Sequence, residues 1–463
     1  AIDYVNSRPH IGHAYEKIIA DFLARWHRKR GEDVFYLTGT DENAEKNEEA
    51  AKEVNVPVKE FVDKNSEIFK ELCSKLLISN DDFIRTTVKK HFDVSQSIFK
   101  TVYDKKEIYK GEYQGFYCVG CEEFLTETQL VDGKCPEHDK KPDVLKEESY
   151  FFKMSNYTDK IKKLLEKGLV KPEHFRNDML ARVEKDGLKD LSVSRINREW
   201  GIDVPIDKKH KIYVWFDALI NYLSGIDYPK GAKYKKYWPA DVHVIGKGIN
   251  WFHSVIWPSM LLGAGIPTPK TVLVHGYVNI KGKKMSKSVG TVVDPLALAD
   301  DYGADALRYY LLREIPFGGD GDFSEEGLIN RYNNELANDL GNLVKRINTL
   351  VGRSFKGKLK KTGKDELGLL KELAKSDKLI DDFRLNDAID IVWRQIVAIN
   401  SYLNQKEPWK IRDEEKLKGI LYNVLEGIRF VTSYIEPLLP DTASRIGRQL
   451  GFEVLEFSKL KFG

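Results

Sequence analysis

Cysteine is scarce in this chain, and its scarcity excludes a disulfide-dense secreted fold. Only four cysteines occur among 463 residues. Long apolar runs are also lacking. The best candidate, from Ser254 to Ile266, is interrupted by Pro258 and falls short of the about 18 residues that a membrane-spanning helix needs. No basic stretch followed by an apolar one opens the chain as a secretory signal would. We therefore expect a cytoplasmic protein with no membrane partner.

An excess of charge of one sign is lacking as well. The chain has 74 basic and 71 acidic residues, for a net charge of +3. This balance neither requires nor excludes a nucleic-acid partner, which would have to bind to a local basic patch. Hydrophobic residues make up 42% of the chain, which is enough for several cores and excludes wholesale disorder.

The order of the expected elements indicates an α/β protein. Residues 1–107 give a short extended run, a helix from Pro9 to Lys29, a strand over 33–37, a turn over 38–40 and helices from Glu42 to Leu77. Such alternation predicts a parallel sheet with helices on its faces. Further strands are expected after residue 210, at 211–215, 242–245 and 271–274.

Helical periodicity dominates the chain from about Glu325 onward and predicts a separate helical bundle. The expected helices cover 328–351, 369–382, 386–403 and 414–435. A basic loop separates the first two, and its cations are Arg353, Lys356, Lys358, Lys360, Lys361 and Lys364. The pattern favours a solvated connector, with contact to a polyanion as the alternative.

Two short motifs carry the strongest chemical signal. His10 and His13 flank Gly12 at the turn from the first strand into the first helix, where a helix N-terminus suits phosphate. A lone pair of this kind is more typical of surface histidines. The second motif is a basic loop around Lys284-Met-Ser-Lys-Ser288, whose ammonium groups suit a triphosphate.

Together the two motifs resemble the signature pair of class I aminoacyl-tRNA synthetases. Other stretches resemble the methionyl-tRNA synthetase family over essentially the whole chain. They begin at Tyr213 (YVWFDA), Phe252, Arg308 (RYYLLREIPF) and Glu335 (ELANDLGNL). The resemblance is to the bacterial-like type with a single zinc knuckle and without an appended tRNA-binding module. It implies a ligase that activates L-methionine with ATP and transfers it to tRNA(Met), with Mg²⁺ accompanying the ATP, in a chain that we expect to be a monomer.

The third constellation is a set of metal ligands at zinc spacing. It reads Cys118-x2-Cys121-x13-Cys135-x2-His138. Four nitrogen and sulfur ligands in two short knuckles suit a tetrahedral Zn²⁺ site, and no open position is evident, so we expect the zinc to be structural. A disulfide is disfavoured in a reducing compartment.

The resemblance also implies roles for individual residues. His10 and His13 would bind the α-phosphate, Lys284 and Lys287 the leaving pyrophosphate, and Gly12 and Ser286 would complete the ATP site. Methionine would be held by Ile2, Tyr4, Asp41, Trp215, Leu219, Tyr222, His253 and Trp257, with Asp41 at the amino group. The tRNA anticodon would be bound by Asn342, Arg346 and Trp409. Taken singly, each aromatic residue is more typical of core packing.

The implied fold is a Rossmann-like catalytic domain split by a zinc-bearing insertion and followed by an all-α anticodon-binding bundle. The expected parts are the first catalytic half (1–107), the insertion (108–210), the second half (211–265), the connecting segment with the lysine loop (266–325) and the bundle (326–463).

Three departures from the family pattern leave a second hypothesis open. Asn43 stands where the family has histidine, Gly248 where it has aspartate, and Asp3 where it has an uncharged residue. They motivate the alternative of a catalytically weakened paralogue that binds tRNA. Another class I synthetase for an apolar amino acid is disfavoured, because a large editing insertion is lacking.

Overall fold

The computed structural model describes residues 1–120, 123–125, 127, 130–136, 139–196, 198–284 and 292–462, without the side chains at 113, 114, 123, 124, 145 and 284. It forms two compact units. Unit 1 comprises Ala1–Pro9, Leu37–Leu72 and Asn80–His275, and unit 2 comprises His10–Tyr36, Cys73–Ser79 and Gly276–Gly463.

Unit 1 contains the expected parallel strands. In one sheet β2 (Leu37–Asp41) lies between β1 (Ile2–Tyr4) and β3 (Asp82–Arg85). In a second, β13 (Thr271–His275) lies between β12 (Val242–Gly246) and β7 (Val170–Lys171). The amino group of Ala1 donates to the carbonyl of Val244 at 3.0 Å and so links β1 to β12. The α/β prediction is confirmed.

Two predicted strands were misplaced. The apolar run 33–37 precedes the strand, and the predicted turn 38–40 lies inside β2. Gly39 fits there because a Cβ would lie 1.9 Å from the carbonyl oxygen of Ile84 on the neighbouring strand. The second strand, expected over 211–215, ends at Ile212, and helix α7 (Val214–Ala218) follows. A short buried apolar run has no periodicity that separates strand from helix.

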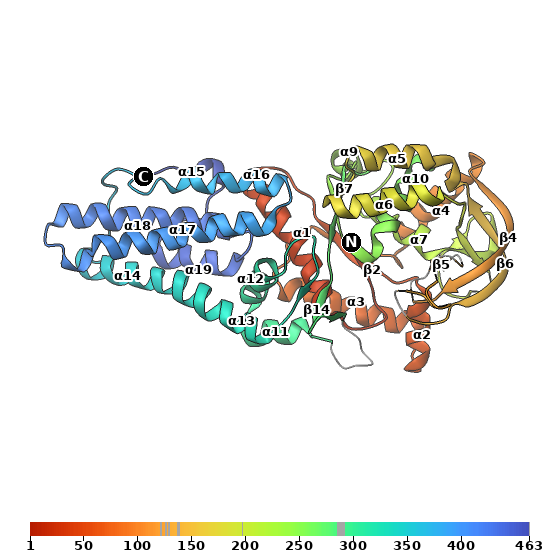
Figure 1. Ribbon diagram of the computed structural model, residues 1–463, viewed down its shortest axis with the longest axis horizontal. Coiled ribbons are helices and arrows are strands. Elements are labelled where there is room, and N and C mark those ends of the chain that lie inside the picture. The colour runs from red at the N-terminus through yellow and green to blue at the C-terminus, as the bar shows by residue number, and fades with distance from the viewer. Residues whose placement is uncertain are drawn as a thin grey trace. The chain divides into compact units, whose positions relative to one another are not determined.

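The segment expected as an insertion carries antiparallel sheets. Strands β4 (Ile108–Cys118) and β6 (Asp143–Phe152) form a long curved hairpin (Figure 1). The shorter strands there are β5 (Glu123–Leu125), β8 (Leu191–Ser192), β9 (Ser194–Ile196), β10 (Asp203–Val204) and β11 (Asp207–Ile212). Strand β7 lies within the same stretch of sequence but pairs in parallel with β13.

Helices cover the strands of unit 1. They are α2 (Glu45–Glu53), α3 (Val58–Lys75), α4 (Lys89–Asp104), α5 (Thr158–Glu166), α6 (Glu173–Asp186), α8 (Asn221–Ser224), α9 (Ala232–Tyr237) and α10 (Trp257–Ala264). A short π-helix over Phe252–Ile256 leads directly into α10.

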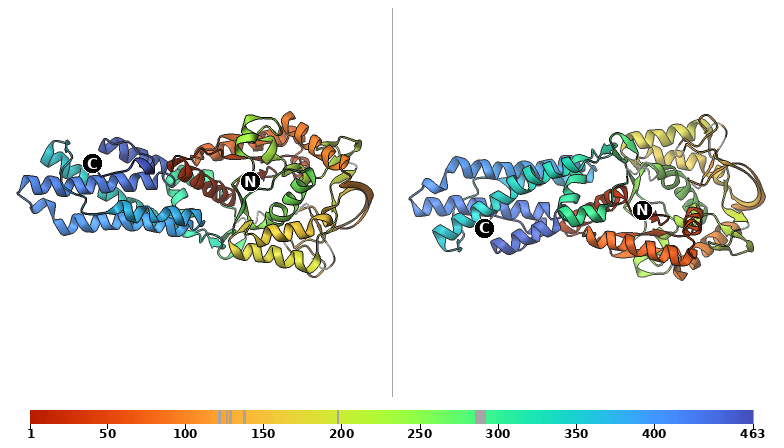
Figure 2. Two further views of the ribbon diagram at one scale, coloured as in Figure 1. Left: turned by 90° about the horizontal axis from the view of Figure 1, so that it is seen from above. Right: turned by 90° about the horizontal axis from the view of Figure 1, so that it is seen from below.

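Unit 2 begins with α1 (Ile11–Lys29) and contains the long helices α17 (Leu385–Lys406) and α18 (Glu414–Ile435), which lie side by side in Figures 1 and 2. Its other helices are α11 (Pro295–Tyr302), α12 (Ala304–Glu314), α13 (Glu325–Arg331), a π-helix (Tyr332–Gly341), α14 (Asn342–Phe355), α15 (Leu369–Leu373), α16 (Lys375–Asp381) and α19 (Pro440–Leu450). A small sheet joins β14 (Val278–Ile280) to β15 (Lys283–Lys284) and β16 (Gly321–Asp322). No described helix is long and apolar enough to cross a membrane.

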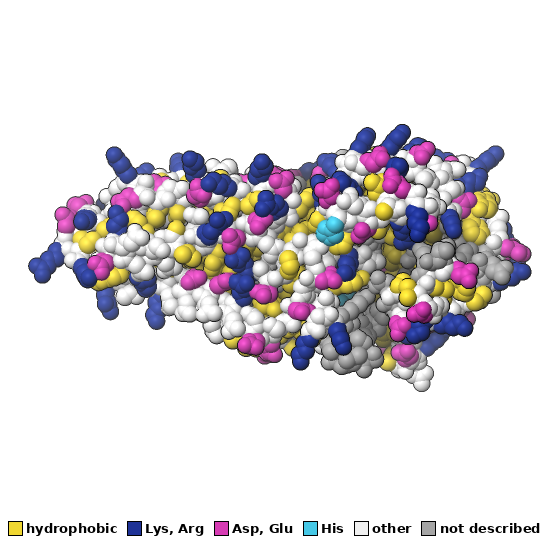
Figure 3. Space-filling model, viewed as in Figure 1, with side chains coloured by type: hydrophobic (Ala, Val, Ile, Leu, Met, Phe, Trp, Pro, Cys, Tyr) yellow, Lys and Arg dark blue, Asp and Glu magenta, His cyan; other side chains and the backbone are white. Residues whose placement is uncertain are grey.

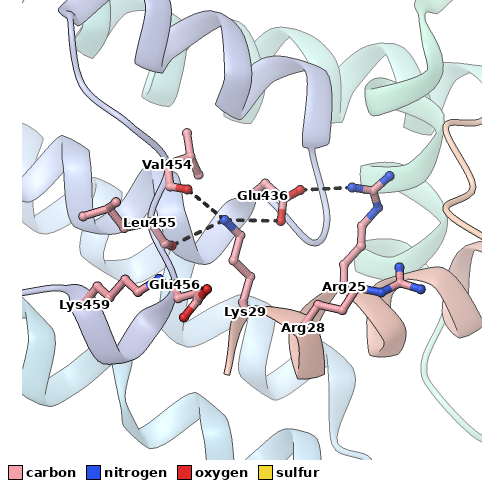
Figure 4. A pocket seen from close by; sticks show the side chains of 8 residues that line it. All are labelled: Arg25, Arg28, Lys29, Glu436, Val454, Leu455, Glu456 and Lys459. Atoms are coloured by element: carbon pink, nitrogen blue, oxygen red, sulfur yellow. Dashed lines mark hydrogen bonds and ion pairs between the residues drawn. The ribbon is translucent and has the colours of Figure 1, made fainter. Parts of the chain in front are cut away.

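Two cations, Arg308 and Lys29, tie the parts of unit 2 together. Arg308 on α12 is fully buried and pairs with Asp21 on α1 at 2.7 Å, while its other donors reach backbone carbonyls. Lys29 lines a cavity of about 370 Å³ and donates to the carbonyls of Val454 and Leu455 at 3.2 and 3.4 Å (Figure 4). Burial is the main reason that the pKa of Lys29 is lowered. These bonds fasten the C-terminal segment to α1.

Candidate functional site

The residues expected to hold methionine all belong to unit 1. Parallel pairing of β1 with β2 sets Tyr4 opposite Asp41. Ile2 is two residues before Tyr4 and therefore lies on the same face of β1. Asp41 is only 2% exposed. The sheet thus places a buried carboxylate beside an aromatic ring.

Stacked aromatic rings surround Trp215. Its indole stacks on Phe252 with ring centroids 3.7 Å apart, and Tyr4 meets it edge-on at 6.0 Å. Leu219 lies four residues further along, at the end of α7, and is buried. Such a wall of rings suits a thioether, which offers polarizability and only weak acceptance.

A second group of rings is fixed by hydrogen bonds. The hydroxyl of Tyr222 lies 2.8 Å from Nε2 of His253, whose Nδ1 lies 3.0 Å from the carbonyl of Ile249. A carbonyl only accepts, so Nδ1 carries a proton and Nε2 accepts from the hydroxyl in the neutral ring.

His243 packs beside these rings. Trp257 donates its indole N–H to Nε2 of His243 at 3.2 Å. Burial, helped by the neighbouring His253, holds the pKa of His243 well below its usual range. His243 therefore presents no cation to a bound side chain.

A buried hydrogen-bond network joins the strand that bears Asp41 to the helix that bears Trp215. Asn43 donates to Asp217 at 2.7 Å and to the carbonyl of Thr86 at 3.1 Å. The other carboxylate oxygen of Asp217 lies 2.6 Å from Nε2 of His91 and accepts from Ser95 at 3.1 Å. Asn43 is thus committed to the scaffold.

The neighbouring Glu42 is fixed just as firmly. It is fully buried and accepts two hydrogen bonds from Arg85, at 2.6 and 2.9 Å. Trp200 donates to the backbone carbonyl of Glu42 at 2.8 Å, and Asn47 donates to that of Asp41 at 3.0 Å. The backbone that carries Asp41 is therefore held on both sides. Gly248, the second departure, lies exposed in the turn Lys247–Ile249.

The two histidines of the first motif cap helix α1, in unit 2. The ring Nδ1 of His10 accepts from the backbone N–H of Gly12 at 3.1 Å. Nδ1 of His13 accepts from the backbone N–H of His10 at 3.0 Å, and the rings stack at 3.8 Å. With both Nδ1 atoms accepting, each neutral ring carries its proton on Nε2. The helix begins at Ile11, so Pro9 precedes the cap and is not the first helical residue.

The described residues that flank the second signature motif belong to unit 2. Lys284 closes β15, and the chain after residue 291 comes back to α1, where the N–H of Ile11 donates to the carbonyl of Val293 at 3.1 Å. The side chain of Lys284 and all of Ser286 and Lys287 lie outside the described residues.

The three residues expected at the anticodon also belong to unit 2 and lie near one another. Arg346 on α14 donates to Asn404 at 2.7 Å, and its guanidinium lies 5.8 Å from the ring centroid of Trp409. The indole of Trp409 is 52% exposed, which is unusual for so large an apolar ring. Asn342 is exposed one helical turn before Arg346.

Two of the four expected zinc ligands are described. Cys118 ends β4, and Cys135 lies in a tight turn where its carbonyl accepts from the N–H of Asp139 at 2.8 Å. Both cysteines are buried in one small cluster with Leu125. Cys121 and His138 lie outside the described residues.

The sequence did not single out several residues that shape the site. Phe252 forms the floor under Trp215, the ammonium of Lys46 lies 3.4 Å from the centroid of Tyr4, and Asp217 and His91 support the pocket from behind. Asp217 and His91 could have been noticed in the sequence, because an Asp and a His within otherwise apolar or helical runs need polar partners when they are buried.

Comparisons with known proteins agree with one another. The family described as tRNA synthetases class I (M) matches residues 1–141 and 138–348. Methionine–tRNA ligases of Caldanaerobacter subterraneus and Thermotoga maritima are 45% and 44% identical, over 100% and 98% of this chain and 75% and 74% of their own. A Mycobacterium tuberculosis methionyl-tRNA synthetase solved in complex with methionyl-adenylate superposes with a TM-score of 0.95 at 37% identity, over 99% of this chain and 95% of that one. The chain therefore belongs to the class I methionyl-tRNA synthetase family.

Proposed function

We propose that this methionine–tRNA ligase uses the residues described above to activate L-methionine with ATP and to transfer it to tRNA(Met). In the first step a carboxylate oxygen of methionine attacks the α-phosphorus of ATP, and pyrophosphate leaves. In the second a terminal ribose hydroxyl of the tRNA attacks the carbonyl carbon of the adenylate, and AMP leaves. Both steps depend mainly on positioning and on stabilisation of charge.

Within unit 1, methionine would place its ammonium group at Asp41 and its thioether among the rings of Trp215, Tyr222, His253 and Trp257. The carboxylate of Asp41 supplies the one charge that the amino group needs. The aromatic rings would then favour an uncharged, polarizable side chain. Tyr4, Ile2 and Leu219 would complete the pocket.

The histidine cap is the observation that carries the proposal for the nucleotide. It fixes the tautomer of His10 and His13 so that each ring offers an Nε2–H donor at a helix N-terminus. Such donors suit the charge that develops on the α-phosphate. Lys284, Ser286 and Lys287 would bind the leaving pyrophosphate, and Mg²⁺ would enter with ATP.

We also propose the domain division and the zinc site. The catalytic halves would be 1–107 and 211–265, the insertion 108–210, the connecting segment 266–325 and the anticodon-binding bundle 326–463. The burial of Cys118 and Cys135 in one small cluster supports a structural Zn²⁺ held with Cys121 and His138. The metal would cross-link an insertion whose core is too small to hold alone. Metal analysis of protein never exposed to chelator should give about one zinc per chain, and a metal-free, folded sample would contradict the site.

ATP–pyrophosphate exchange, run with each of the twenty amino acids, tests the function. Methionine alone should support exchange. Exchange with a different amino acid would overturn the pocket, and none from folded, zinc-loaded protein would favour the weakened, tRNA-binding alternative. All the proposed residues belong to one chain, so a monomer would suffice.

One matched pair of variants tests the histidines. His13→Gln keeps a capping residue at the third helical position but removes the imidazole, and it should slow exchange about 100-fold if a donor to the phosphate is lost. His27→Gln, on the same helix, should leave exchange unchanged. Equal rates in the two variants would exclude the proposed role of His13.

A further inference from the structure

The loop after α14 has a concentration of positive charge that the proposed anticodon site does not include. Between residues 340 and 364 no acidic residue occurs, while eight lysines and arginines do. Six of these cations fall in the segment 353–364, which we call the basic segment: Arg353, Lys356, Lys358, Lys360, Lys361 and Lys364. All six are exposed.

The cations of the basic segment are not neutralised within the protein. Among the described residues, none of the six side chains forms an ion pair or hydrogen bond. Three other exposed lysines of unit 2 are paired: Lys375 with Glu372 at 2.6 Å, Lys406 with Glu366 at 2.7 Å and Lys410 with Glu407 at 2.7 Å. A solvated connector has no need to keep acidic residues away from its cations, whereas a surface that binds a polyanion does.

The segment is fastened to the bundle. Asn423, almost fully buried on α18, donates to the carbonyl of Lys364 at 3.0 Å and accepts from the N–H of Glu366 at 2.9 Å. At the other end Lys356 takes a left-handed conformation (φ 53°) as the C-cap of α14, and Gly357 donates to the carbonyl of Val351 at 3.2 Å. The charges are therefore displayed from a defined backbone.

The basic segment continues the face of α14 that carries the proposed anticodon residues. Arg353 is two helical turns after Arg346 and eleven residues after Asn342, so all three lie on one face. At 1.5 Å per residue the distance along the axis from Asn342 to Arg353 is about 16 Å. Figure 3 shows Lys and Arg side chains projecting around the end of the bundle where α17 passes into α18, and Lys418 near the start of α18 lies 5.9 Å from the ring of Phe355.

We propose that the basic segment binds the phosphodiester backbone of the tRNA substrate next to its anticodon. Phosphate contacts supply affinity without reading sequence, whereas stacking on Trp409 and hydrogen bonds from Asn342 and Arg346 would read bases. The inference rests on the proposed function, since it extends the anticodon site along the same helix.

The test compares two triple variants that each remove three positive charges from unit 2. The first is Lys358→Gln, Lys360→Gln and Lys361→Gln in the basic segment. The control is Lys371→Gln, Lys375→Gln and Lys378→Gln, which are exposed residues of α15 and α16. Steady-state aminoacylation of tRNA(Met) is measured from low to high salt, beside methionine-dependent pyrophosphate exchange.

The basic-segment variant should keep full exchange activity and lose on the order of 10-fold in kcat/KM for tRNA. The slope of its plot of log(kcat/KM) against log(salt) should also be smaller in magnitude by about 2. The reason is that each phosphate contact contributes about 0.7 to that slope, and the variant removes three lysines. The loss should be the same for a tRNA with an altered anticodon. The control should match the wild type.

Three outcomes would overturn the inference. The basic-segment variant could show the wild-type salt slope, or the control variant could show the same change in slope and kcat/KM. The basic-segment variant could also bind an unrelated RNA more weakly while it charges tRNA(Met) normally. The failure of the proposed function is distinguishable from these, because the wild type itself would then show no exchange with methionine.

Discussion

The proposed methionine pocket around Trp215 and the proposed tRNA surface around Trp409 differ in their physical character. Around Trp215 the side chains of Asn43, His91 and Asp217 are buried and hydrogen-bonded to one another, and burial holds the pKa of the nearby His243 low. Along the basic segment the cations are exposed and form no ion pair with any described residue, and Trp409 is half open to solvent. In the proposed roles, a small uncharged side chain would be selected by a preformed apolar pocket, whereas a long polyanion would be bound by accessible charges and by stacking.

The largest expected effect breaks the buried network. Asp217→Ala removes the acceptor for Asn43, His91 and Ser95, and it should lower the free energy of unfolding by about 3–5 kcal/mol, because each buried donor left without a partner costs about 1–3 kcal/mol. Urea denaturation measures the change. Asp93→Ala, which removes an exposed carboxylate paired with Lys89 at 2.7 Å, should cost less than about 1 kcal/mol. Similar losses in both would show that burial gives the network no special weight.

The next effect separates the substrates within the pocket. Trp215→Ala should raise KM for methionine about 10- to 100-fold, since a buried Trp side chain is worth several kcal/mol, and should change KM for ATP much less. Trp251→Ala serves as the control, because that indole packs against the guanidinium of Arg182. A parallel rise in both KM values would count against the pocket assignment.

A third variant addresses the exposed region. Trp409→Ala should leave pyrophosphate exchange intact and lower kcat/KM for tRNA about 10-fold or more, as expected for the loss of one stacked base. Tyr332→Ala removes another exposed ring of unit 2 and should have little effect. Charging at the wild-type rate by the Trp409 variant would discard its role in binding the anticodon.

The smallest effect concerns pH. Because the folded state holds the pKa of His243 below that of the unfolded chain, about 6.5, the unfolded state binds more protons below that pH. The contribution of His243 to the free energy of unfolding is then fully present above about pH 6.5 and is lost as the pH decreases through that value. Between pH 7.5 and 5.5 the wild type should lose about 1 kcal/mol more than His243→Gln, measured by urea midpoints. An identical loss in both would mean that His243 does not contribute.

The sequence predicted the helices whose apolar residues recur at regular spacing, and it misplaced strands whose position depends on pairing with distant strands. Helix α18 runs from Glu414 to Ile435 as expected, because its apolar positions recur with helical spacing. Strand β2 has the unpromising sequence Leu-Thr-Gly-Thr-Asp and exists because it pairs with strands on both sides.

The site shows the same division between local motifs and distant contacts. The capping pair His10 and His13 could be placed by spacing alone, since its members are three residues apart. The stack of Trp215 on Phe252 joins segments 37 residues apart, and the bond of Asn43 to Asp217 spans 174 residues. No local pattern encodes such a contact, so the scaffold role of Asn43 emerged only from the fold.

The histidine cap also links two positions in evolution. His10 and His13 each hold the other's backbone or ring in place, and both are proposed to touch the same phosphate. A change at one site alters the surroundings in which the other works, so their mutational effects are not additive. Substitutions at these positions should therefore be epistatic: the residue accepted at one position should depend on the residue at the other.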